Sequence, residues 1–401
     1  MDMKRYLSLF LVCAVLAGIF LSGCSASKHN ERYVVVLSMD GFRSDYPDRA
    51  YTPTLDSLAR VGIRSTFRPS FPSVTFPNHY SMATGLHPDH HGLVNNFFYA
   101  PDLDSIYRMA DPTPGFYGGE PIWNTAEKQG VRTASFFWVG SEYPIQGRQP
   151  SIWKPFDKHV PYSDRADSVV AWLRLPEDVR PHLVMWYIEE PDGIGHICTP
   201  DSSATLQKVE ELDRVLNHFF NEARKLDIFD KIDFIVLSDH GMATYTPDKY
   251  VNLNDYLPRD SFDYVFDGVP TLLYPKAGYT DKAYAILKQV PHIRVWKKNE
   301  IPEKYIYGSN LRIGNLFVMP DVGTYLDFRT ESRPRFAATH GYDNFAPEMQ
   351  AIFYAAGPSF KQHVELPAMA NVNLYQIIAR LLDIKPAPND GDSLVVNALF
   401  R

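Results

Sequence analysis

Short runs of apolar and β-branched residues constrain the fold of this chain more than any other feature of its sequence. Five of them read as strands: YVVVLSMDGF (33–42), HLVMWYIEEPD (182–192), IDFIVLSDHG (232–241), TLLYP (271–275) and AIFYAAG (351–357). Strands that are apolar along their whole length are buried on both faces, which is typical of a parallel or mixed sheet covered by helices. Helical spacing of apolar residues appears between them, for example at 52–62, 201–225 and 371–383. We therefore predict an α/β fold with a doubly wound, mostly parallel central sheet flanked by helices.

The composition and net charge of the chain limit the kinds of molecule that it can be expected to bind. The 401 residues are 45% hydrophobic and 14% aromatic, which is enough to bury a large core, and the formal net charge is -7. Proteins that bind nucleic acid carry a basic surface that neutralises phosphates. The sequence therefore predicts no nucleic-acid binding patch, and any phosphate recognition must come from groups other than a Lys/Arg cluster.

The N-terminus has the pattern of a secretory signal. MDMKRYLSLFLVCAVLAGIFLSGC begins with basic residues, continues with an apolar stretch and ends with small residues. Its closing LSGC resembles a bacterial lipobox, so we expect residues 1–23 to be removed and Cys24 to carry lipid, with 24–32 as a tether. An uncleaved anchor helix is the alternative. Both readings predict a protein of the bacterial cell envelope; the lipid would hold it at the outer membrane, facing the periplasm or the surface. Cys198 would then be the sole thiol, so no internal disulfide is expected.

Carboxylates and imidazoles follow several of the apolar runs. They are Asp40, Asp192 and His196 of PDGIGH, Asp239 and His240 of SDHGM, and His340 of THGYDN. Parallel sheets bind ligands at the carboxyl ends of their strands, so we expect these groups to meet there. A mixed Asp/His set suits zinc better than magnesium or calcium, which prefer oxygen ligands. The spacing of 192–196 would let two ligands of one loop turn toward the same ion. Each motif alone also fits turn chemistry or a loop hydrogen bond, but crowding all of them without a cation would be costly.

A threonine precedes a predicted helix in the segment PSFPSVTFPNHYSMATGLHPDHHGLVNN (69–96). Pro77 is favoured in the first turn of a helix and Gly85 supplies a C-terminal stop, so Thr75 lies at a helix N-terminus, where backbone N–H groups favour an anion. Such a hydroxyl is ordinarily an N-cap. If it also contacts a divalent cation, it can ionise near neutral pH and attack phosphorus.

These motifs resemble those of one family. LSMDGFR, TFPNHYSMATGLHPDHHGLVNN, PDGIGH, SDHGM and THGYDN occur in the order found in the nucleotide pyrophosphatase/phosphodiesterase (type I phosphodiesterase) family of the alkaline phosphatase superfamily. The likeness runs from about residue 33 to 398. It implies a catalytic domain over 33–401. Within this range the pattern of the segment 244–335 loosens into short strands and Pro- and Tyr-rich turns, and we interpret the segment as an insertion that caps the site.

The resemblance also implies roles for individual residues. Two zinc ions per chain are expected, one held by Asp192, His196 and His340, and the other by Asp40, Asp239, His240 and the Thr75 oxygen. Thr75 would be the nucleophile, and the Asn96 amide would hydrogen-bond a phosphate oxygen, although a turn role for Asn96 is open. Phe76, Phe156 and Tyr187 match the aromatic positions that hold a nucleotide base, although such rings are as often part of a core.

The implied activity is hydrolysis of phosphodiester or pyrophosphate bonds of nucleotides, which releases a nucleoside 5′-monophosphate through a phospho-threonine intermediate. The substrate would be a small molecule, and lipid would be the only link to a membrane. One alternative keeps the metal chemistry but changes the substrate to a phosphocholine-type lipid head group, a phosphonate or a monoester. A remote alternative is a non-catalytic lipoprotein that binds metal or nucleotide.

Overall fold

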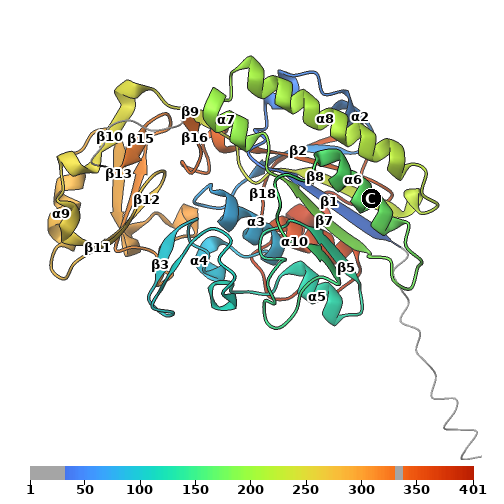
Figure 1. Cartoon of the computed structure of the whole chain (residues 1–401), viewed down its shortest axis with the longest axis horizontal. Helices are drawn as coiled ribbons and strands as arrows, with labels where there is room; N and C mark the ends of the chain where they lie inside the picture. Colours follow the sequence, from blue (N-terminus) through green and yellow to red (C-terminus); the bar gives the residue numbers. More distant parts are fainter. Residues whose placement is uncertain (1–31, 330–336) are drawn as a thin grey trace, which may run out of the picture. The chain divides into compact units, whose positions relative to one another are not determined.

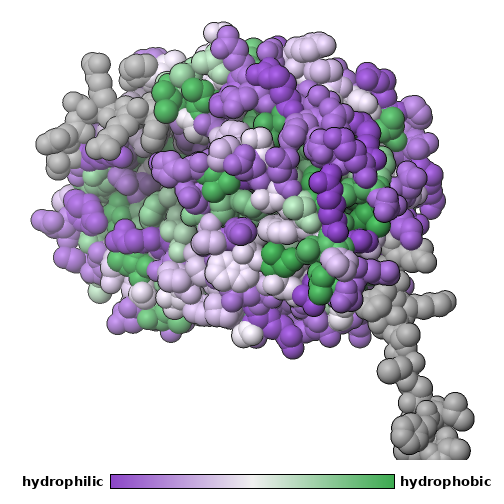
Figure 2. Space-filling view, turned by 45° about the vertical axis from the view of Figure 1, so that its right-hand side comes forward, coloured by the Kyte–Doolittle hydropathy of each residue, from purple (hydrophilic) through white to green (hydrophobic). Residues whose placement is uncertain are grey.

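The structure is a computed structural model of the whole chain, and it describes residues 32–329 and 337–401. The predicted signal (1–23), Cys24 and the tether up to residue 31 lie outside the described residues. Within the part that is described, no helix is both long and apolar enough to cross a bilayer. On the face shown in Figure 2, hydrophobic side chains are interspersed among hydrophilic ones.

One mixed sheet of eight strands forms the centre of the described chain (Figure 1). Its order is β18-β2-β17-β8-β1-β7-β5-β6. The strands are β1 (Tyr33–Met39), β2 (Ile63–Arg68), β5 (Thr133–Phe136), β6 (Ile152–Lys154), β7 (Leu183–Ile188), β8 (Ile232–Leu237), β17 (Ala351–Ala356) and β18 (Val364–Ala370). All neighbours pair in parallel except β17, which is antiparallel to both β2 and β8. The predicted mostly parallel central sheet is confirmed, with β17 as its one reversed strand.

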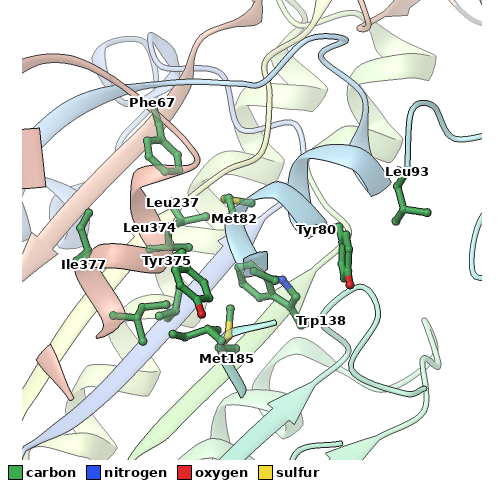
Figure 3. Close-up of a cluster of buried hydrophobic side chains, with 14 of the residues drawn as sticks. Phe67, Tyr80, Met82, Leu93, Trp138, Met185, Leu237, Leu374, Tyr375 and Ile377 are labelled. Carbon is green, nitrogen blue, oxygen red and sulfur yellow. The ribbon is translucent and has the colours of Figure 1, made fainter. Parts of the chain in front are cut away.

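Helices cover both faces of this sheet because its strands are apolar on both sides. Within β1, Val34 and Val36 pack into one core with α3, α5 and α10, whereas Val35 and Leu37 pack into a second core with α2, α6 and α8. The helices are α2 (Pro53–Val61), α3 (Thr75–Thr84), α5 (Ile122–Lys128), α6 (Tyr162–Leu173), α8 (Ser203–Ala223) and α10 (Asn373–Leu381). Figure 3 shows the first core, where Met185 and Leu237 of the sheet lie near Met82 of α3 and Tyr375 of α10. The doubly wound layering is therefore as predicted.

A second, antiparallel sheet lies within the segment 244–335. Its order is β11-β12-β14-β13, with β11 (Phe262–Phe266), β12 (Thr271–Pro275), β13 (Ile293–Lys297) and β14 (Leu316–Pro320), and α9 (Thr280–Leu287) follows β12. The sequence run TLLYP reads like a strand of the central sheet, and this interpretation is wrong. The run is apolar because the small sheet is also buried on both sides: Leu272 packs into the core that α3 and α10 share, and Leu273 packs against α9.

Two polar clusters attach this segment to the rest of the described chain. The carboxylate of Asp89 accepts hydrogen bonds from the backbone N–H groups of Gly308, Ser309 and Asn310. Arg312 pairs with Asp102 at 2.7 Å. Each cluster joins residues more than 200 positions apart, so residues 308–312 of this segment are fixed beside Asp89 and Asp102.

Short elements complete the fold. They are the strand pairs β3 (Phe98–Ala100) with β4 (Ser105–Tyr107), β9 (Ala243–Thr244) with β16 (Ala338–Thr339), and β10 (Tyr250–Asn252) with β15 (Tyr325–Asp327), and the helices α4 (Pro88–His91), α7 (Asp192–Cys198) and α11 (Ser393–Asn397). The pair β9–β16 matters most for the position of His340, because it brings together the two ends of the segment 244–335.

Candidate active site

The acidic and imidazole side chains meet at one edge of the central sheet. Asp40 follows β1, and Asp239 and His240 follow β8. Since β8, β1 and β7 are parallel neighbours, their carboxyl ends lie side by side, and the segment after β7 reaches the same edge with Asp192. His340 comes from beyond the segment 244–335, directly after β16.

Gly41 permits the closest approach at this edge. Its φ of 66° lies in the left-handed region, and a Cβ atom there would stand 2.9 Å from Cα of Asp192. The backbone N–H of Asp192 donates to the carbonyl of Asp40 at 3.0 Å. A larger residue after Asp40 would therefore push the two aspartates apart.

The six side chains form two adjoining sets. We call Asp40, Asp239 and His240 the first ligand group, and Asp192, His196 and His340 the second ligand group. In the first, His240 Nε2 lies 3.1 Å from Asp239 Oδ2 and 3.4 Å from Asp40 Oδ1.

In the second ligand group, Asp192 stands between the two imidazoles, 3.4 Å from His196 Nε2 and 3.6 Å from His340 Nε2. The stacked rings of His240 and His340, with centroids 3.6 Å apart, connect the two groups. The tightest clusters, in which all ligand atoms lie within 4.8 Å, are Asp40–Asp239–His240 and Asp192–His240–His340. His196 is therefore at the margin of the second group.

The hydrogen bonds of the imidazoles indicate which nitrogen is available for a cation. Nδ1 of His196, His240 and His340 faces the backbone carbonyls of Ala338, Gly241 and Ser73, at 2.8, 2.9 and 3.0 Å respectively. A carbonyl only accepts, so each Nδ1 carries the proton and each Nε2 is directed to the cluster. This arrangement is typical of metal-binding histidines, whose other ring nitrogen is fixed by a second hydrogen bond.

Three buried carboxylate oxygens are also typical of side chains that bind a metal ion. Asp40 Oδ1, Asp192 Oδ1 and Asp239 Oδ2 accept no hydrogen bond, although each lies within 3.6 Å of an imidazole nitrogen. Buried carboxylate oxygens are normally hydrogen-bonded, and unpaired ones are costly. Together with a donor set of carboxylate oxygens and imidazole nitrogens, these orphaned atoms fit zinc, and the residues present could hold two ions.

Charge crowding in the first ligand group shows in the pKa values. Burial raises the pKa of Asp40 well above its usual range, and the carboxylates of Asp239 and Asp192 raise it further. For Asp239, burial acts to raise the pKa, but His240 and His79 lower it below its usual value. Two neighbouring carboxylates thus respond in opposite directions, as expected where like charges share a buried site.

In the second ligand group, an acid and an imidazole each stabilise the charge of the other. Burial acts to raise the pKa of Asp192, but His196 and His340 lower it to about 2. Burial acts to lower the pKa of His196, but Asp192 raises it to about 9. Burial lowers the pKa of His340 to about 3, and His240 contributes to the shift. A cation bound by this group would therefore have to displace a proton from His196.

Asp192 and His196 differ from the prediction in their local structure. The sequence predicts a loop over 192–196, whereas the structure places both residues in α7, which starts at Asp192. The two are four residues apart on that helix, so both side chains project from one face. The two side chains thus turn toward the same point as predicted, but they do so from a helix and not from a loop.

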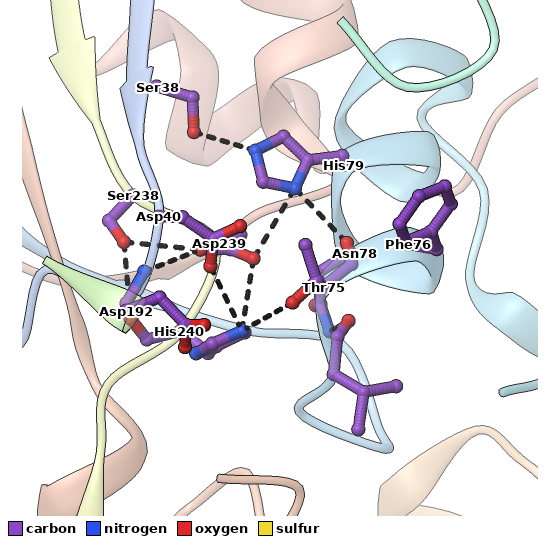
Figure 4. Close-up of polar contacts among 12 residues, drawn as sticks. Ser38, Asp40, Thr75, Phe76, Asn78, His79, Asp192, Ser238, Asp239 and His240 are labelled. Atoms are coloured by element: carbon purple, nitrogen blue, oxygen red, sulfur yellow. Dashed lines mark hydrogen bonds and ion pairs between the residues drawn. The ribbon is translucent and has the colours of Figure 1, made fainter. Parts of the chain in front are cut away.

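Thr75 lies beside the first ligand group (Figure 4). It is the first residue of α3, which ends at Gly85 with φ 68°, as the sequence predicts. The N-cap is Val74 and not Thr75, so the capping role considered for this hydroxyl is wrong. Its Oγ1 instead lies 3.1 Å from His240 Nε2. The turn before it is fixed by Asn78, whose amide donates to the carbonyls of Pro72 and Val74.

Asn96 is joined to the same helix terminus. Its Oδ1 accepts the backbone N–H of Phe76 at 3.0 Å. Because that donor identifies the oxygen, the Nδ2 group of Asn96 is left as a donor next to Thr75 and the first turn of α3. Backbone N–H groups at a helix N-terminus and a side-chain amide together can bind a phosphate.

The three aromatic candidates line one cavity. Phe76, Phe156 and Tyr187 border a space of about 120 Å³, together with Phe137 and Tyr143. Phe156 is 49% exposed, so it lies at the mouth of the cavity. Tyr187 belongs to both regions, because its ring lines the cavity and its hydroxyl donates to Asp40 Oδ2 at 2.6 Å.

Two further residues of the site, His79 and Ser38, were not predicted from the sequence. His79 is fully buried, and its ring bridges Ser38 Oγ and Asp239. The available signal was spacing: His79 follows Thr75 by four residues in the same predicted helix, which places both on one face.

The fold and the site together define a class of protein. It is an α/β protein with clustered carboxylates and imidazoles at the carboxyl edge of its sheet, next to a hydroxyl at a helix N-terminus. The profile of the type I phosphodiesterase/nucleotide pyrophosphatase family matches residues 34–343. The chain belongs to this family.

Known proteins that are similar to this chain in sequence and in structure support this family assignment. The chain is 33% identical to venom phosphodiesterase CdcPDE of Crotalus durissus collilineatus, with 92% of this chain and 46% of that protein covered. It is 32% identical to ectonucleotide pyrophosphatase/phosphodiesterase family member 3 of Rattus norvegicus, with 92% and 44% covered. The chain thus spans about half the length of these curated relatives.

The structure of murine ectonucleotide pyrophosphatase/phosphodiesterase 5 matches with a TM-score of 0.89 and 29% identity, over 92% of this chain and 100% of that chain. An inactive threonine-to-alanine variant of the same murine protein, solved in complex with AMP, matches equally well. The central sheet flanked by helices is therefore the alkaline phosphatase-like fold of these relatives.

Proposed function

We propose that this protein is a two-zinc phosphodiesterase and nucleotide pyrophosphatase that releases a nucleoside 5′-monophosphate. The observation that carries the proposal is the position of Thr75 Oγ1, 3.1 Å from an imidazole of the first ligand group and at the N-terminus of α3. A hydroxyl, a group of side chains that could hold a cation, and a helix N-terminus that favours an anion meet there. Family membership and the AMP complex of the murine relative support the choice of a nucleotide as substrate.

Asp40, Asp239 and His240 would hold one zinc ion and Asp192, His196 and His340 the other. When bound, zinc lowers the pKa of hydroxyl groups and water and offsets negative charge on a reacting phosphate. The Thr75 oxygen would be a further ligand of the first ion, as the sequence predicts, and His240 lies close to both groups.

Thr75 would act as the nucleophile. Its Oγ loses the hydroxyl proton and attacks phosphorus in line with the bond to the leaving group. The bond to the leaving group breaks, an alcohol or a phosphate chain departs with a proton, and the phospho-threonine that forms still carries the nucleoside on its phosphate. Water then hydrolyses the bond between Thr75 Oγ and phosphorus, which releases the nucleoside 5′-monophosphate and restores the hydroxyl. The N–H groups that begin α3 and the Nδ2 of Asn96 bind phosphate oxygens during both steps. Two half-reactions of this kind are typical of nucleophilic catalysis.

The aromatic cavity would hold the nucleotide base. Rings on several sides favour a flat heterocycle by stacking, without a demand for one base. Because the cavity and Thr75 share the helix α3 through Phe76, a base in the cavity places the 5′-phosphate near the hydroxyl.

A panel of chromogenic esters tests this function. We expect a nitrophenyl ester of a nucleoside 5′-monophosphate to be hydrolysed with a higher kcat/KM than nitrophenyl phosphate or nitrophenyl phosphocholine, and the product to be the nucleoside 5′-monophosphate. A preference for either of the two other esters would contradict the nucleotide assignment and favour a monoesterase or a head-group hydrolase.

We also propose that the protein is exported and anchored in the bacterial cell envelope by lipid on Cys24. The support is the sequence pattern of residues 1–24. Mass spectrometry of the mature N-terminus should show a lipid-modified Cys24, and Cys24→Ala should move the protein from the membrane to the soluble fraction. An unmodified Cys24 in a membrane-bound protein would contradict this.

A further inference from the structure

A buried histidine joins the helix of the proposed nucleophile to the first ligand group. His79 lies in α3, one turn after Thr75, and its side chain has no exposed surface. Its Nδ1 is 3.1 Å from the carbonyl oxygen of Thr75 and 3.3 Å from Asp239 Oδ2 (Figure 4). The same ring therefore contacts the residue that would attack and a residue that would bind the cation.

The neighbours of His79 Nδ1 identify this nitrogen as the protonated one. A carbonyl oxygen only accepts hydrogen bonds, so Nδ1 is protonated and its N–H donates to the Thr75 carbonyl. Asp239 Oδ2 lies next to the same nitrogen, where the positive end of the N–H dipole attracts it. This holds whether the ring is neutral or charged. Asp239 Oδ1 is already fixed by the backbone N–H of Gly41 at 3.1 Å. With His79 near Oδ2, both oxygens of the carboxylate have a defined orientation.

The ring itself is held rigidly. Nε2 lies 2.9 Å from Ser38 Oγ, two residues before Asp40 in β1. Trp138 and Tyr187 contact the imidazole edge-to-face, with centroids 5.3 and 5.0 Å away. His79 thus has almost no freedom to turn, so a displacement of α3 would be transmitted to Asp239 and the reverse.

We infer that His79 is a positioning residue that orients Asp239 for cation binding and fixes Thr75 relative to the first ligand group. The inference rests on the proposed zinc-dependent function. Partners that orient metal ligands are worth about 10–100-fold in metal affinity when removed. His79 contacts no reacting atom, so its effect should appear in zinc affinity and in kcat but little in KM.

The test is zinc binding by the metal-free full-length protein, measured by competition with a chromogenic chelator, for the wild type, His79→Phe and His79→Asn. Phenylalanine keeps a ring but has no N–H, so we expect the affinity of one of the two zinc sites to fall about 10–100-fold and the other to change less than about threefold. Asparagine can present an N–H close to the position of Nδ1 and should recover most of the lost affinity and kcat.

His91 provides a matched control. It is also a buried histidine, its Nε2 is also 2.9 Å from a serine hydroxyl (Ser81 Oγ), and it also contacts a ring edge-to-face, that of Tyr80. It touches no residue of either ligand group among its described contacts. His91→Phe should therefore leave both zinc affinities within about threefold of the wild type, a range below the 10-fold lower bound for an orienting partner.

The possible results distinguish a failure of the positioning role from a failure of the proposed function. If the wild type binds zinc and hydrolyses nucleotides but His79→Phe matches it in affinity and kcat, the positioning role is wrong and the proposed function stands. A wild type that binds no zinc would overturn both. If His79→Phe does not fold, His79→Asn is compared with His79→Gln, whose amide extends toward the Nε2 side. The inference requires tighter zinc binding for asparagine, and equal or reversed affinities would contradict it.

Discussion

Two regions of the site meet at Thr75, and their side chains differ in chemistry: one region is ionisable and the other is mainly aromatic. The ligand cluster gathers buried carboxylates and imidazoles from the ends of β1 and β8, from α7 and from the loop after β16. The aromatic cavity is lined mainly by rings and small apolar residues, with Glu142 as the one ionisable carboxylate in its lining. Charged groups close to a phosphate stabilise a transition state, whereas rings that stack on a base bind substrate and transition state equally.

This contrast predicts a division of labour. Changes in the ligand cluster should lower kcat, and changes in the cavity should raise KM. Tyr187 connects the two regions, because its ring lines the cavity while its hydroxyl binds Asp40. Substitutions in each region, and removal of the metal, can therefore show whether the two functions are separate.

Thr75→Ala should have the largest effect. Loss of the nucleophile is expected to lower kcat by at least about 10³-fold with KM nearly unchanged, since loss of a nucleophile in comparable enzymes costs that much or more. Steady-state kinetics with a nucleoside 5′-(nitrophenyl) phosphate would measure it. Thr75→Ser, which keeps a hydroxyl, is the control and should retain far more activity. An alanine variant as active as the wild type would exclude Thr75 as the nucleophile.

Removal of metal should abolish turnover by a similar margin without emptying the cavity. After exhaustive chelation we expect activity to fall by about 10³-fold, and two equivalents of zinc per chain should restore it. Nucleoside binding, followed by quenching of the intrinsic tyrosine and tryptophan fluorescence, should persist in the metal-free protein. Full activity in the presence of the chelator would refute the metal-dependent mechanism.

Asn96→Ala removes one donor near the phosphate. A single such donor is typically worth about 10²-fold in kcat, so we expect a loss of that order with a small change in KM. Asn96→Asp is the companion variant: it keeps the acceptor for the Phe76 N–H but adds negative charge, and it should be at least as impaired. An unchanged kcat in both variants would return Asn96 to a structural role in its turn.

Phe156→Ala should act on recognition. Stacking of a base on an aromatic ring contributes about 1–3 kcal/mol, so KM for nucleotide esters should rise roughly tenfold while kcat changes little. Nitrophenyl phosphate, which has no base, should show no such change. Tyr187→Phe is the matched variant on the other side: it keeps the ring, loses the hydrogen bond to Asp40, and should lower kcat instead. The same kinetic change in both variants would show that the two regions do not act separately.

His91 belongs to neither region. From its burial we predict a small effect of pH on the free energy of unfolding. Burial lowers the pKa of His91 well below its usual value, and its Nδ1 accepts the backbone N–H of Leu93 at 3.1 Å. The unfolded chain takes up a proton below about pH 6.5 that the folded chain rejects, so stability is complete above that pH and falls by about 1.4 kcal/mol per pH unit below it. Urea unfolding of the metal-free protein at about pH 7 and about pH 5.5 measures this change.

His91→Asn should reduce the loss of stability between those two pH values by the contribution of one proton. Asparagine is chosen because its side-chain oxygen can lie close to the position of Nδ1 and accept the Leu93 N–H without titrating. A variant with the same pH dependence as the wild type would show that His91 does not titrate as its burial implies.

Much of the site could be predicted because it depends on strand ends. A run such as IVLSDHG specifies a buried strand and places its acid and imidazole at a known edge of a parallel sheet, so Asp40, Asp239 and His240 follow from local sequence. The sequence could not show that Asp192 and His196 lie in a helix, because two glycines in DGIGH lower helix propensity and tertiary contacts override it.

Other features depend on distant contacts that no local pattern reveals. TLLYP has the composition of a central strand, but burial between two different cores gives the same composition to a small antiparallel sheet. The role of Val74 as N-cap, which frees the Thr75 hydroxyl, is set by the turn that Asn78 holds. His79 gave only a weak signal, since its partner Ser38 is 41 positions away and its partner Asp239 is farther still.

Location of the zinc ions in crystals of the full-length protein tests the central claim most directly. Anomalous difference density collected at the zinc edge should show two peaks, one within bonding distance of Asp40, Asp239, His240 and Thr75 Oγ1, and one within bonding distance of Asp192, His196 and His340. Absence of both peaks from zinc-soaked crystals, or peaks only at sites that these residues do not touch, would contradict the account.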